Sequence, residues 1–289
     1  MKAWFITNKY FVSNSFLEMK KLIFLSAKKH NIDIVEYNNV DIINILSKSN
    51  FDKPDFVLFW DKDVKLAKYI ENMGIKVYNN SESIKVCDDK SLTYIALKNK
   101  NIKMPKTIFS PLIYFHNIYE ENDFLEFAMS HLKYPFVFKE CFGSFGKQVF
   151  LIKNKSDLIS HIKQIDGRPF IMQEFIESSF GRDLRVYVVG DKIIGAMLRV
   201  NNVGDFRANI EIGGVGKIYT LNQYQEKMAL DVVKELNLSF AGVDLLFGEN
   251  DEPILCEVNS NAYFTHFNKI LNTNVADYIF EYIVLDIKK

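Results

Sequence analysis

Short apolar strands alternate with amphipathic helices at the start of the chain, and this alternation restricts the fold more than any other feature. Residues 3–6 and 56–60 are continuous apolar runs typical of buried strands, and residues 32–37 alternate apolar and polar positions. Residues 15–29 carry the apolar spacing of an amphipathic helix. Because a strand–helix–strand order favours a parallel sheet, we expect an N-terminal α/β lobe over residues 1–88.

The rest of the chain predicts two further lobes of mixed helices and strands. A helix is expected over residues 88–99, and residues 89–175 then predict a small central lid lobe. Residues 176–289 predict a C-terminal α+β lobe, with one hairpin across Gly190-Asp191 and a second strand pair further on. The strands expected in the central lobe are 135–140, 148–152 and 170–174.

The charge balance and the cysteines disfavour several classes of partner and site. The 289 residues include 36 Lys and Arg and 36 Asp and Glu, so the formal net charge is zero. No global field then attracts nucleic acid or an anionic membrane, and no apolar stretch reaches the roughly 18 residues of a membrane span. Cys87, Cys141 and Cys256 are odd in number and widely spaced, which disfavours a disulfide framework or a zinc knuckle. We expect a cytoplasmic protein.

Two neighbouring strands near the C-terminus carry acidic and amide side chains among apolar ones. In the strand that ends at Asn259, strict alternation places Leu255, Glu257 and Asn259 on one face and Cys256 on the other. Hairpin pairing with the preceding strand brings Asp244 close to facing Glu257. Three oxygen donors therefore converge.

A hard cation such as magnesium prefers oxygen ligands, so we predict that Asp244, Glu257 and Asn259 hold Mg²⁺, with Mn²⁺ as an alternative ion. The competing interpretation is that the two carboxylates are solvated outward positions of an ordinary hairpin. Both lie in near-continuous apolar runs, where an unpaired buried charge is costly, and this favours the metal site.

A glycine-containing loop joins two expected strands of the central lobe. Lys139 lies in the first strand, and the loop contains Gly143, Ser144, Phe145 and Gly146. Glycines let backbone N–H groups approach phosphate oxygens, and a lysine at the base neutralises phosphate charge. The loop matches neither the Walker A pattern nor the GxGxxG of protein kinases. Taken alone, it does not distinguish a phosphate-covering flap from a simple hairpin turn.

Arginines gather in the third region. Asp183 and Arg185 share one face of an expected strand, and Arg199 and Arg207 follow. Converging arginines can stabilise the charge that develops when a terminal phosphoryl group moves. A two-residue turn at Gly190-Asp191 would place Arg199 on the opposite face from Arg185. Both can serve one site only if a bulge or another register intervenes.

These motifs resemble, in sequence order, those of the ATP-grasp superfamily and, within it, the RimK-like amino-acid ligases. The resemblance covers about residues 88–261. It rests on Asp89-Lys90, FVFKE with the flap GSFGKQV, QEFIE, GRDLRVYVVGDKIIGAMLR, DFRAN, and GVDLLF paired with EVNSN.

The resemblance implies an ATP-grasp fold with three lobes and a reaction in which ATP activates a carboxylate as an acyl phosphate before an amine attacks. The product is an amide or peptide bond, and the implied partners are a nucleotide and a carboxylate plus amine pair, from small molecules or peptides. By position, the resemblance assigns phosphate contacts to Lys90, Lys139, Gly143, Ser144, Phe145 and Gly146. It assigns the adenine hinge to Gln173, Glu174, Phe175 and Ile176, and the ribose contact to Asp183. It places four side chains near the terminal phosphate or acyl phosphate: Arg185, Arg199, Arg207 and Asn209.

The turn after the metal strand departs from the family pattern. Family members that add glutamate commonly carry small residues and a proline there, whereas this chain continues from Asn259 as SNAYFT to His266. Ile212 also stands where a basic residue often precedes the glycines. We therefore do not assign glutamate as the added amino acid. The alternative function is an ATP-binding regulatory or scaffold protein without turnover, against which the arginine set argues. A homo-oligomer is compatible with the sequence but not indicated by it.

Overall fold

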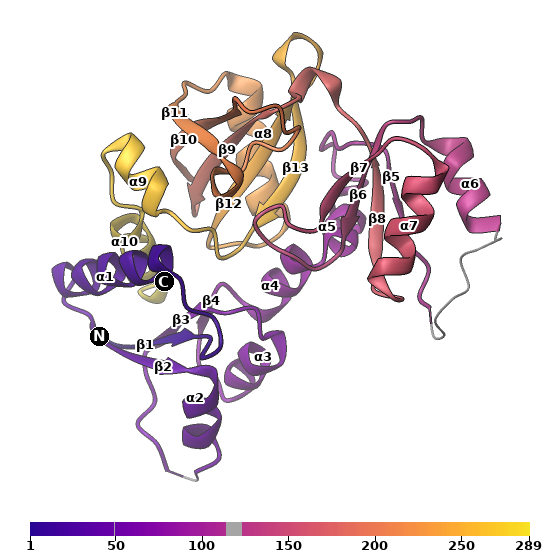
Figure 1. Ribbon diagram of the computed structural model, residues 1–289. Helices are drawn as coiled ribbons and strands as arrows, with labels where there is room; N and C mark the ends of the chain where they lie inside the picture. Colours follow the sequence, from indigo (N-terminus) through magenta and orange to yellow (C-terminus); the bar gives the residue numbers. More distant parts are fainter. Residues whose placement is uncertain (49, 114–122) are drawn as a thin grey trace.

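Three β-sheets form the framework of the computed structural model, which describes residues 1–48, 50–113 and 123–289. The sheets lie in three lobes that meet at a common junction (Figure 1). Each sheet falls within one of the three predicted lobe ranges, while the lobe boundaries themselves stay a prediction.

The first sheet is parallel, as the alternating sequence pattern predicts, and its strand order is β2-β1-β3-β4. Every residue of β3 is buried, because helices cover a parallel sheet on both faces. Helix α1 begins where the Ser13 hydroxyl accepts a hydrogen bond from the Phe16 N–H at 3.1 Å. The elements of this lobe are β1 (Lys2–Thr7), α1 (Asn14–Lys29), β2 (Asp33–Asn38), α2 (Asn39–Leu46), β3 (Phe56–Trp60), α3 (Val64–Asn72) and β4 (Val77–Tyr78).

The helix expected over residues 88–99 is a helix over residues 90–97 in the structure, and a further helix over residues 81–88, which was not predicted, precedes it. Asp89 is extended (φ −96°, ψ 109°), and its carboxylate caps the second helix by accepting from the Ser91 and Leu92 N–H groups. The capping geometry ends one helix and starts the next, so Lys90 becomes the first residue of the second. The two helices are α4 (Ser81–Asp88) and α5 (Lys90–Leu97).

The second sheet is antiparallel, in the order β5-β8-β6-β7, and two helices pack against it. Strands β6 and β7 pair directly, so the glycine-containing loop between them is the tip of a hairpin. The elements are β5 (Thr107–Phe109), α6 (Asp123–His131), β6 (Phe136–Glu140), β7 (Val149–Ile152), α7 (Lys155–Ile165) and β8 (Phe170–Glu174).

The third sheet is also antiparallel, in the order β11-β10-β9-β12-β13, with α8 packed on one face. Its β9–β10 hairpin turns at Gly190-Asp191, as the sequence predicts. The elements are β9 (Arg182–Val189), β10 (Lys192–Asn201), β11 (Gly214–Ile218), α8 (Gln223–Glu235), β12 (Phe240–Phe247), β13 (Pro253–Asn259), α9 (Thr265–Leu271) and α10 (Val275–Ile287).

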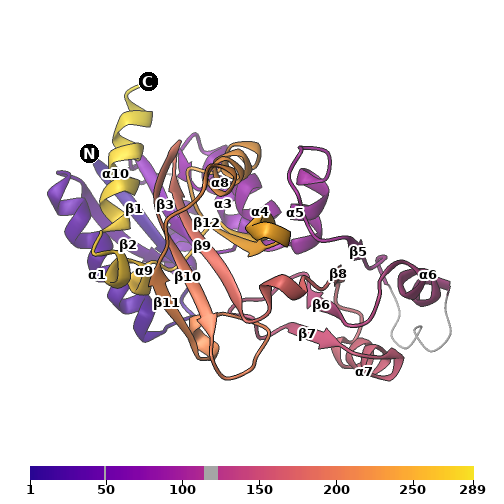
Figure 2. The same cartoon turned by 90° about the horizontal axis from the view of Figure 1, so that it is seen from above.

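The last helix completes the core of the first lobe. Helix α10 lies beside α1 in both ribbon views (Figures 1 and 2). Phe280 and Ile283 of α10 are buried in one apolar cluster with Phe5 of β1 and Met19 of α1. At the edge of this contact, the Lys29 ammonium lies 2.7 Å from the Asp277 carboxylate. The first and third lobes therefore share a core.

Candidate active site

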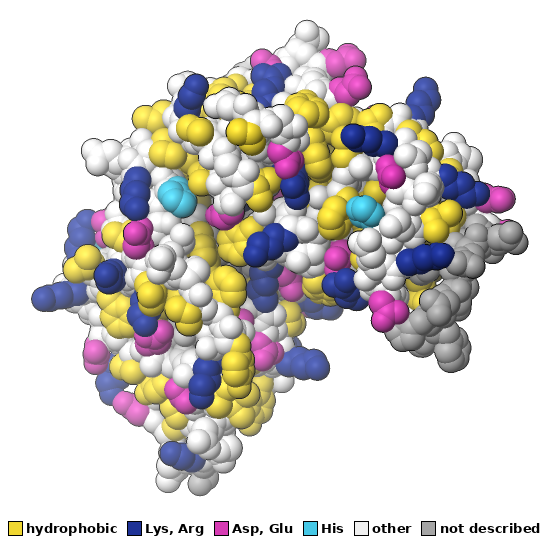
Figure 3. Space-filling view, viewed as in Figure 1, with side chains coloured by type: hydrophobic (Ala, Val, Ile, Leu, Met, Phe, Trp, Pro, Cys, Tyr) yellow, Lys and Arg dark blue, Asp and Glu magenta, His cyan; other side chains and the backbone are white. Residues whose placement is uncertain are grey.

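Two cavities adjoin where the three lobes meet. The smaller, of about 100 Å³, lies between the second and third sheets, and the larger, of about 470 Å³, is bordered by residues of all three lobes. Arg199, Asn209 and Glu257 line both. On the face drawn in Figure 3, basic and hydrophobic side chains lie side by side near this junction.

The structure brings most of the predicted site residues to these two cavities. Besides the three shared residues, those on the smaller cavity are Lys90, Lys139, Gly146, Gln173, Glu174, Phe175, Ile176, Asp183, Arg207 and Asp244. Those on the larger cavity are Ser144, Phe145, Arg185 and Asn259. Gly143, the remaining predicted residue of the flap, lines neither of the two cavities.

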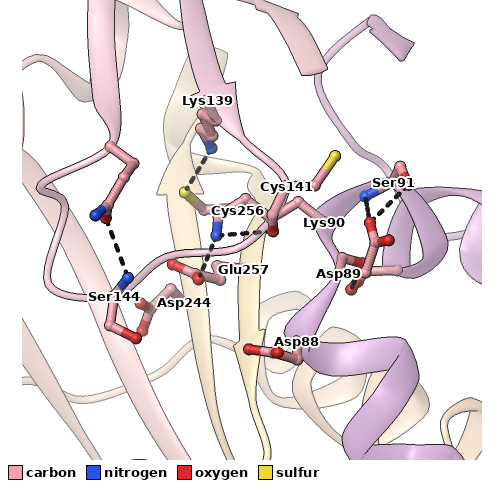
Figure 4. A network of polar contacts seen from close by, with 12 residues as sticks. Asp88, Asp89, Lys90, Ser91, Lys139, Cys141, Ser144, Asp244, Cys256 and Glu257 are labelled. Atoms are coloured by element: carbon pink, nitrogen blue, oxygen red, sulfur yellow. Dashed lines mark hydrogen bonds and ion pairs between the residues drawn. The ribbon is translucent and has the colours of Figure 1, made fainter. Parts of the chain in front are cut away.

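Two lysines line the smaller cavity, Lys90 at the start of α5 and Lys139 in β6 (Figure 4). The Lys90 ammonium lies 3.5 Å from the Glu257 carboxylate and 3.5 Å from the Cys141 carbonyl oxygen. Lys139 is buried in β6, and its ammonium lies 3.8 Å from the Cys256 sulfur. Within the described ranges no carboxylate pairs with Lys139. A buried cation without an anionic partner suits a phosphate group.

The predicted hinge forms the end of β8 and the residues after it. The Gln173 side chain donates from Nε2 to the Thr107 hydroxyl at 2.8 Å. Its Oε1 is buried and has no hydrogen-bond partner in the described structure. Because buried acceptors are normally satisfied, this oxygen is available to a donor on a molecule in the cavity.

Arginines and aspartates form a buried network on one face of the third sheet. The Arg199 guanidinium donates to both Asp183 oxygens, at 2.6 and 2.8 Å, and to Asp244 Oδ2 at 2.9 Å. Arg185 binds Asp244 through two nitrogens, and its Nη2 lies 2.7 Å from Oδ2. Asp183, for which a ribose contact was predicted, thus has both oxygens engaged, and that contact stays a prediction.

A bulge in β10 allows this network to form. Ile193 faces Val188 but Gly195 faces Tyr187, so Ile194 is an extra residue in the ladder. Beyond the bulge, Arg199 lies opposite Asp183 and joins the face that carries Arg185. The requirement for a bulge is therefore confirmed.

A second bulge corrects the predicted alternation in β13. Asp244 faces Glu257, as expected, but Leu245 faces Leu255, so Cys256 is the extra residue. Leu255 packs in the apolar core, and Cys256 lines the smaller cavity beside Glu257. The prediction that Leu255 shares a face with Glu257 and that Cys256 lies opposite was wrong, because a bulge breaks strict alternation.

Ion pairs within this network determine its charge state. Burial alone would raise the pKa of the Asp244 carboxyl, but Arg185 and Arg199 outweigh burial and lower it. The pKa of Arg199 is raised well above its ordinary value, since Asp183 and Asp244 outweigh its burial. Asp244 is therefore held as a carboxylate.

The predicted metal ligands fit an oxygen-preferring cation in part. Among the described residues, the one ion pair of Glu257 is with Lys90 at 3.5 Å, which leaves carboxylate oxygen available. The buried atom of Asn259 without a partner there is Nδ2, which is a donor, so Asn259 could ligate a cation only through Oδ1. Both oxygens of Asp244 are engaged by arginines, so Asp244 can bind a metal only by sharing or exchanging these contacts. Across the described ranges, no group of three or more His, Cys, Asp and Glu forms a metal site. The predicted set contains two carboxylates and an amide.

The flap reaches the third lobe. Gly146 adopts a left-handed φ of 69°, and a Cβ built there would lie 2.9 Å from Asn209 Oδ1. Arg207 Nη1 donates to the Gly146 carbonyl oxygen at 2.6 Å. Phe145 lies against Phe11 and Tyr263, with ring centroids 6.4 and 6.1 Å apart. The hairpin tip therefore covers both cavities.

Residues of the first lobe were missed by sequence analysis. Asn8, Phe11, Asp61 and Lys62 line the larger cavity. One signal was available, since Asp61 directly follows the buried strand β3, and ligands of parallel sheets bind at the carboxyl ends of strands. His266 lies exposed at the rim of the same cavity.

The three cysteines are unpaired. In the part of the chain that the structure describes, no helix is long and apolar enough to cross a bilayer.

Comparison with known proteins shows the family of the chain. The model of the RimK-like ATP-grasp domain matches residues 87–283. An uncharacterised protein of Mycoplasma pneumoniae is 33% identical over 264 residues, which cover 90% of this chain and 91% of that protein. Human β-citrylglutamate synthase B is 32% identical over 225 residues. The aligned region covers 77% of this chain and 56% of that enzyme.

The fold agrees with this assignment. A D-alanine–D-alanine ligase from Bacillus anthracis, solved in complex with ATP, superimposes with a TM-score of 0.76 at 19% sequence identity. The match covers 100% of this chain and 98% of that one, which confirms the predicted ATP-grasp fold. The chain belongs to the RimK-like ATP-grasp family and is an ATP-dependent ligase that joins a carboxylate to an amine.

Proposed function

We propose that the enzyme activates the carboxylate of one substrate as an acyl phosphate and transfers the acyl group to the amine of a second. The observation that carries this proposal is the junction of the two cavities at Arg199, Asn209 and Glu257. The smaller cavity offers lysines and a hinge that suit a nucleotide. The larger, at about 470 Å³, is of the size of ordinary small-molecule sites and suits the carboxylate and amine substrates.

The cationic side chains have distinct roles in this proposal. Lys90 and Lys139 bind the phosphates from the α5 and β6 sides of the smaller cavity. Arg199 and Arg207 stabilise the charge on the terminal phosphoryl group as it moves toward the carboxylate, and Asn209 helps to orient it. Asp183 holds Arg199 in place and Asp205 holds Arg207. Because both guanidinium groups are already positioned, they do not have to reorient when the phosphoryl group moves.

We also propose that Glu257 and Asn259 hold a magnesium ion, with Asp244 as a third ligand when it shares its arginine contacts. Magnesium, or manganese in its place, would supply Lewis-acid neutralisation of the phosphate oxygens. The unpaired cysteines support a reducing compartment such as the cytoplasm.

The identity of the joined molecules is less constrained. The name of the human relative identifies a glutamate conjugate as its product. In this chain, however, the turn after β13 carries Tyr263 and lacks a proline, and Ile212 replaces a basic residue. We infer an amino acid or peptide on at least one side of the reaction and leave glutamate unassigned.

Release of ADP from ATP tests this proposal. We expect release to require magnesium together with a carboxylate and an amine, and to stop when EDTA removes the metal. Glu257→Gln should lower kcat at least about 100-fold, because a metal ligand is lost. Glu249→Gln, on the exposed turn of the same hairpin, is the matched control and should retain activity.

Two results would contradict the proposal. Turnover that persists in EDTA, or in the Glu257→Gln variant, would remove the metal assignment. Nucleotide binding by calorimetry without ADP formation, across amino acids, peptides and small carboxylates, would favour the regulatory alternative.

A further inference from the structure

A buried carboxylate without a cationic partner lies on the wall of the larger cavity. Asp61 is 7% exposed and lines this cavity. Its oxygens accept from Asn8 Nδ2, at 3.1 and 3.3 Å, and from the Lys62 N–H at 2.7 Å. No basic side chain of residues 1–48, 50–113 and 123–289 forms an ion pair with it. The Lys62 ammonium is occupied elsewhere, 2.5 Å from Asp88.

Such an arrangement is costly unless a cation completes it, because buried charges in proteins are paired or bind ions. Burial raises the pKa of the Asp61 carboxyl, and the hydrogen bond from Asn8 opposes that shift. In contrast, Asp183 and Asp244 of the active site are both paired with arginines. Asp61 is the buried carboxylate of this cavity, within the described residues, that lacks such a partner.

A second acceptor lies beside Asp61. Asn261 Nδ2 donates to the Asp61 backbone carbonyl at 2.8 Å, and this contact fixes the orientation of the amide. Asn261 Oδ1 is then a buried acceptor without a partner in the described structure, and Asn261 lines the same cavity. A carboxylate and an unsatisfied carbonyl oxygen together form a site that accepts hydrogen bonds from a cationic N–H group.

The walls of the cavity suit the rest of such a ligand. The same cavity is lined by aromatic side chains, namely Phe11, Trp60, Phe145 and Tyr263. Aromatic faces attract organic cations and pack against aliphatic stems. Arg199 lies where the cavity meets the nucleotide site, and Asp61 lies on the first lobe. The Lys62 ammonium lies on the same cavity as Asp61 but is paired with Asp88. The unpaired carboxylate and the arginine network are therefore contributed by different lobes.

We propose that Asp61 and Asn261 bind a positively charged nitrogen of a substrate, one that keeps its charge while the reaction occurs at the arginine network. This inference rests on the proposed ligase function and names a substrate class for the same site. The class is an organic ammonium or guanidinium compound, such as a basic amino acid or a carboxylate substrate with a free α-ammonium group. A substrate whose only charged groups are carboxylates does not fit.

Binding measured by calorimetry, with the full-length protein, magnesium and a non-hydrolysable ATP analogue, tests this inference. The probes are L-lysine, L-ornithine, L-arginine and putrescine, with glutarate and succinate, which carry carboxylates only, as anionic comparisons. At least one cationic probe should bind more tightly than both anionic ones. Nα-acetyl-lysine and Nε-acetyl-lysine then show whether the α-ammonium or the side-chain ammonium is recognised.

Asp61→Asn should weaken binding of the preferred cation by roughly 10- to 100-fold, as expected when a hydrogen bond to a charged group is lost. The affinity of the Asp61→Asn variant for the ATP analogue should equal that of the wild type, and this result would show that the variant is folded. Asp63→Asn is the matched control, because Asp63 caps α3 without lining the cavity and asparagine caps as well as aspartate. The control should bind the cation normally.

Failure of this inference and failure of the ligase function give different results. If ADP release requires an anionic substrate pair, or if Asp61→Asn binds the cation normally, the cation site is wrong and the ligase function stands. If cations bind through Asp61 but no acid and amine pair supports ADP release, the site stands and the ligase function fails. If no cationic probe binds more tightly than glutarate and succinate, the cation site is wrong.

Discussion

Asp183 binds Arg199 through both carboxylate oxygens, and this contact suggests a role different from the one its position in the family implies. A ribose ligand needs a free oxygen, whereas the oxygens of Asp183 hold a guanidinium whose Nη2 also reaches Asp244. A bidentate pair fixes the plane of an arginine as well as its position. We therefore regard Asp183 as a positioning residue for Arg199.

Asp183→Asn separates the two roles. If Asp183 positions Arg199, kcat should fall by about 10²- to 10³-fold, the range seen when a stabilising donor is lost, while KM for ATP stays near the wild-type value. A large rise in KM for ATP with kcat retained would instead support the ribose contact. Asp191→Asn, in the exposed turn between β9 and β10, serves as the control in steady-state kinetics.

At the scale of elements, two features of the flap favour glycine at position 146: the backbone conformation there and the short distance to Asn209. Gly146 has a left-handed φ, and a Cβ built there would lie 2.9 Å from Asn209 Oδ1, so the Asn209 amide would have to shift. Gly204 has a similar φ of 88°, but no atom lies within 4 Å of a Cβ built there. The two positions separate backbone strain from close approach.

We expect Gly146→Ala to lower kcat/KM at least about 10-fold, because the flap can no longer settle against Asn209 and misplacement of a positioning element is costly. Gly204→Ala should carry only the strain of a left-handed alanine, roughly 1–2 kcal/mol, seen as a lower Tm with near-normal kinetics. Equal activity of the two variants would show that the close approach of the flap is not needed for turnover.

The strands were more predictable than their registers. Strands β3 and β8 have the bounds expected from the sequence. The bulges at Ile194 and Cys256 were not located, because a bulge depends on which residues of the partner strand are opposite. Local alternation cannot contain that information. The need for a bulge between Arg185 and Arg199 was nevertheless visible, because two functional side chains required one face.

At the scale of the whole molecule, the larger cavity was the least predictable feature. Lys90, Lys139 and the residues of β12 and β13 lie in motifs that the sequence displays directly. Asp61 and Asn8 reach the site only because the first lobe is packed against the third, through contacts such as that of Asn261 with the Asp61 carbonyl. Such contacts between distant segments leave no periodic pattern in the sequence.

The shared core of α1 and α10 predicts that the first and third lobes unfold together. Phe280 is fully buried among residues of both, so Phe280→Ala should lower the stability by about 3–5 kcal/mol through cavity formation. Leu285→Ala, at a position of α10 that is 60% exposed, should change Tm little. Calorimetry should show one shifted transition for both lobes in Phe280→Ala. A separate early transition of the third lobe alone would contradict this.

The contact between α1 and α10 also orders the events of biosynthesis. The strands of the first sheet are translated early, yet the apolar face of α1 is covered by a helix far along the chain, since 248 residues separate Lys29 from Asp277. Until the ribosome has released α10, Met19 and Ile23 remain without part of their cover. The nascent first lobe should therefore be a client of chaperones that shield apolar surface, and its native core should close only after the ATP site has been translated.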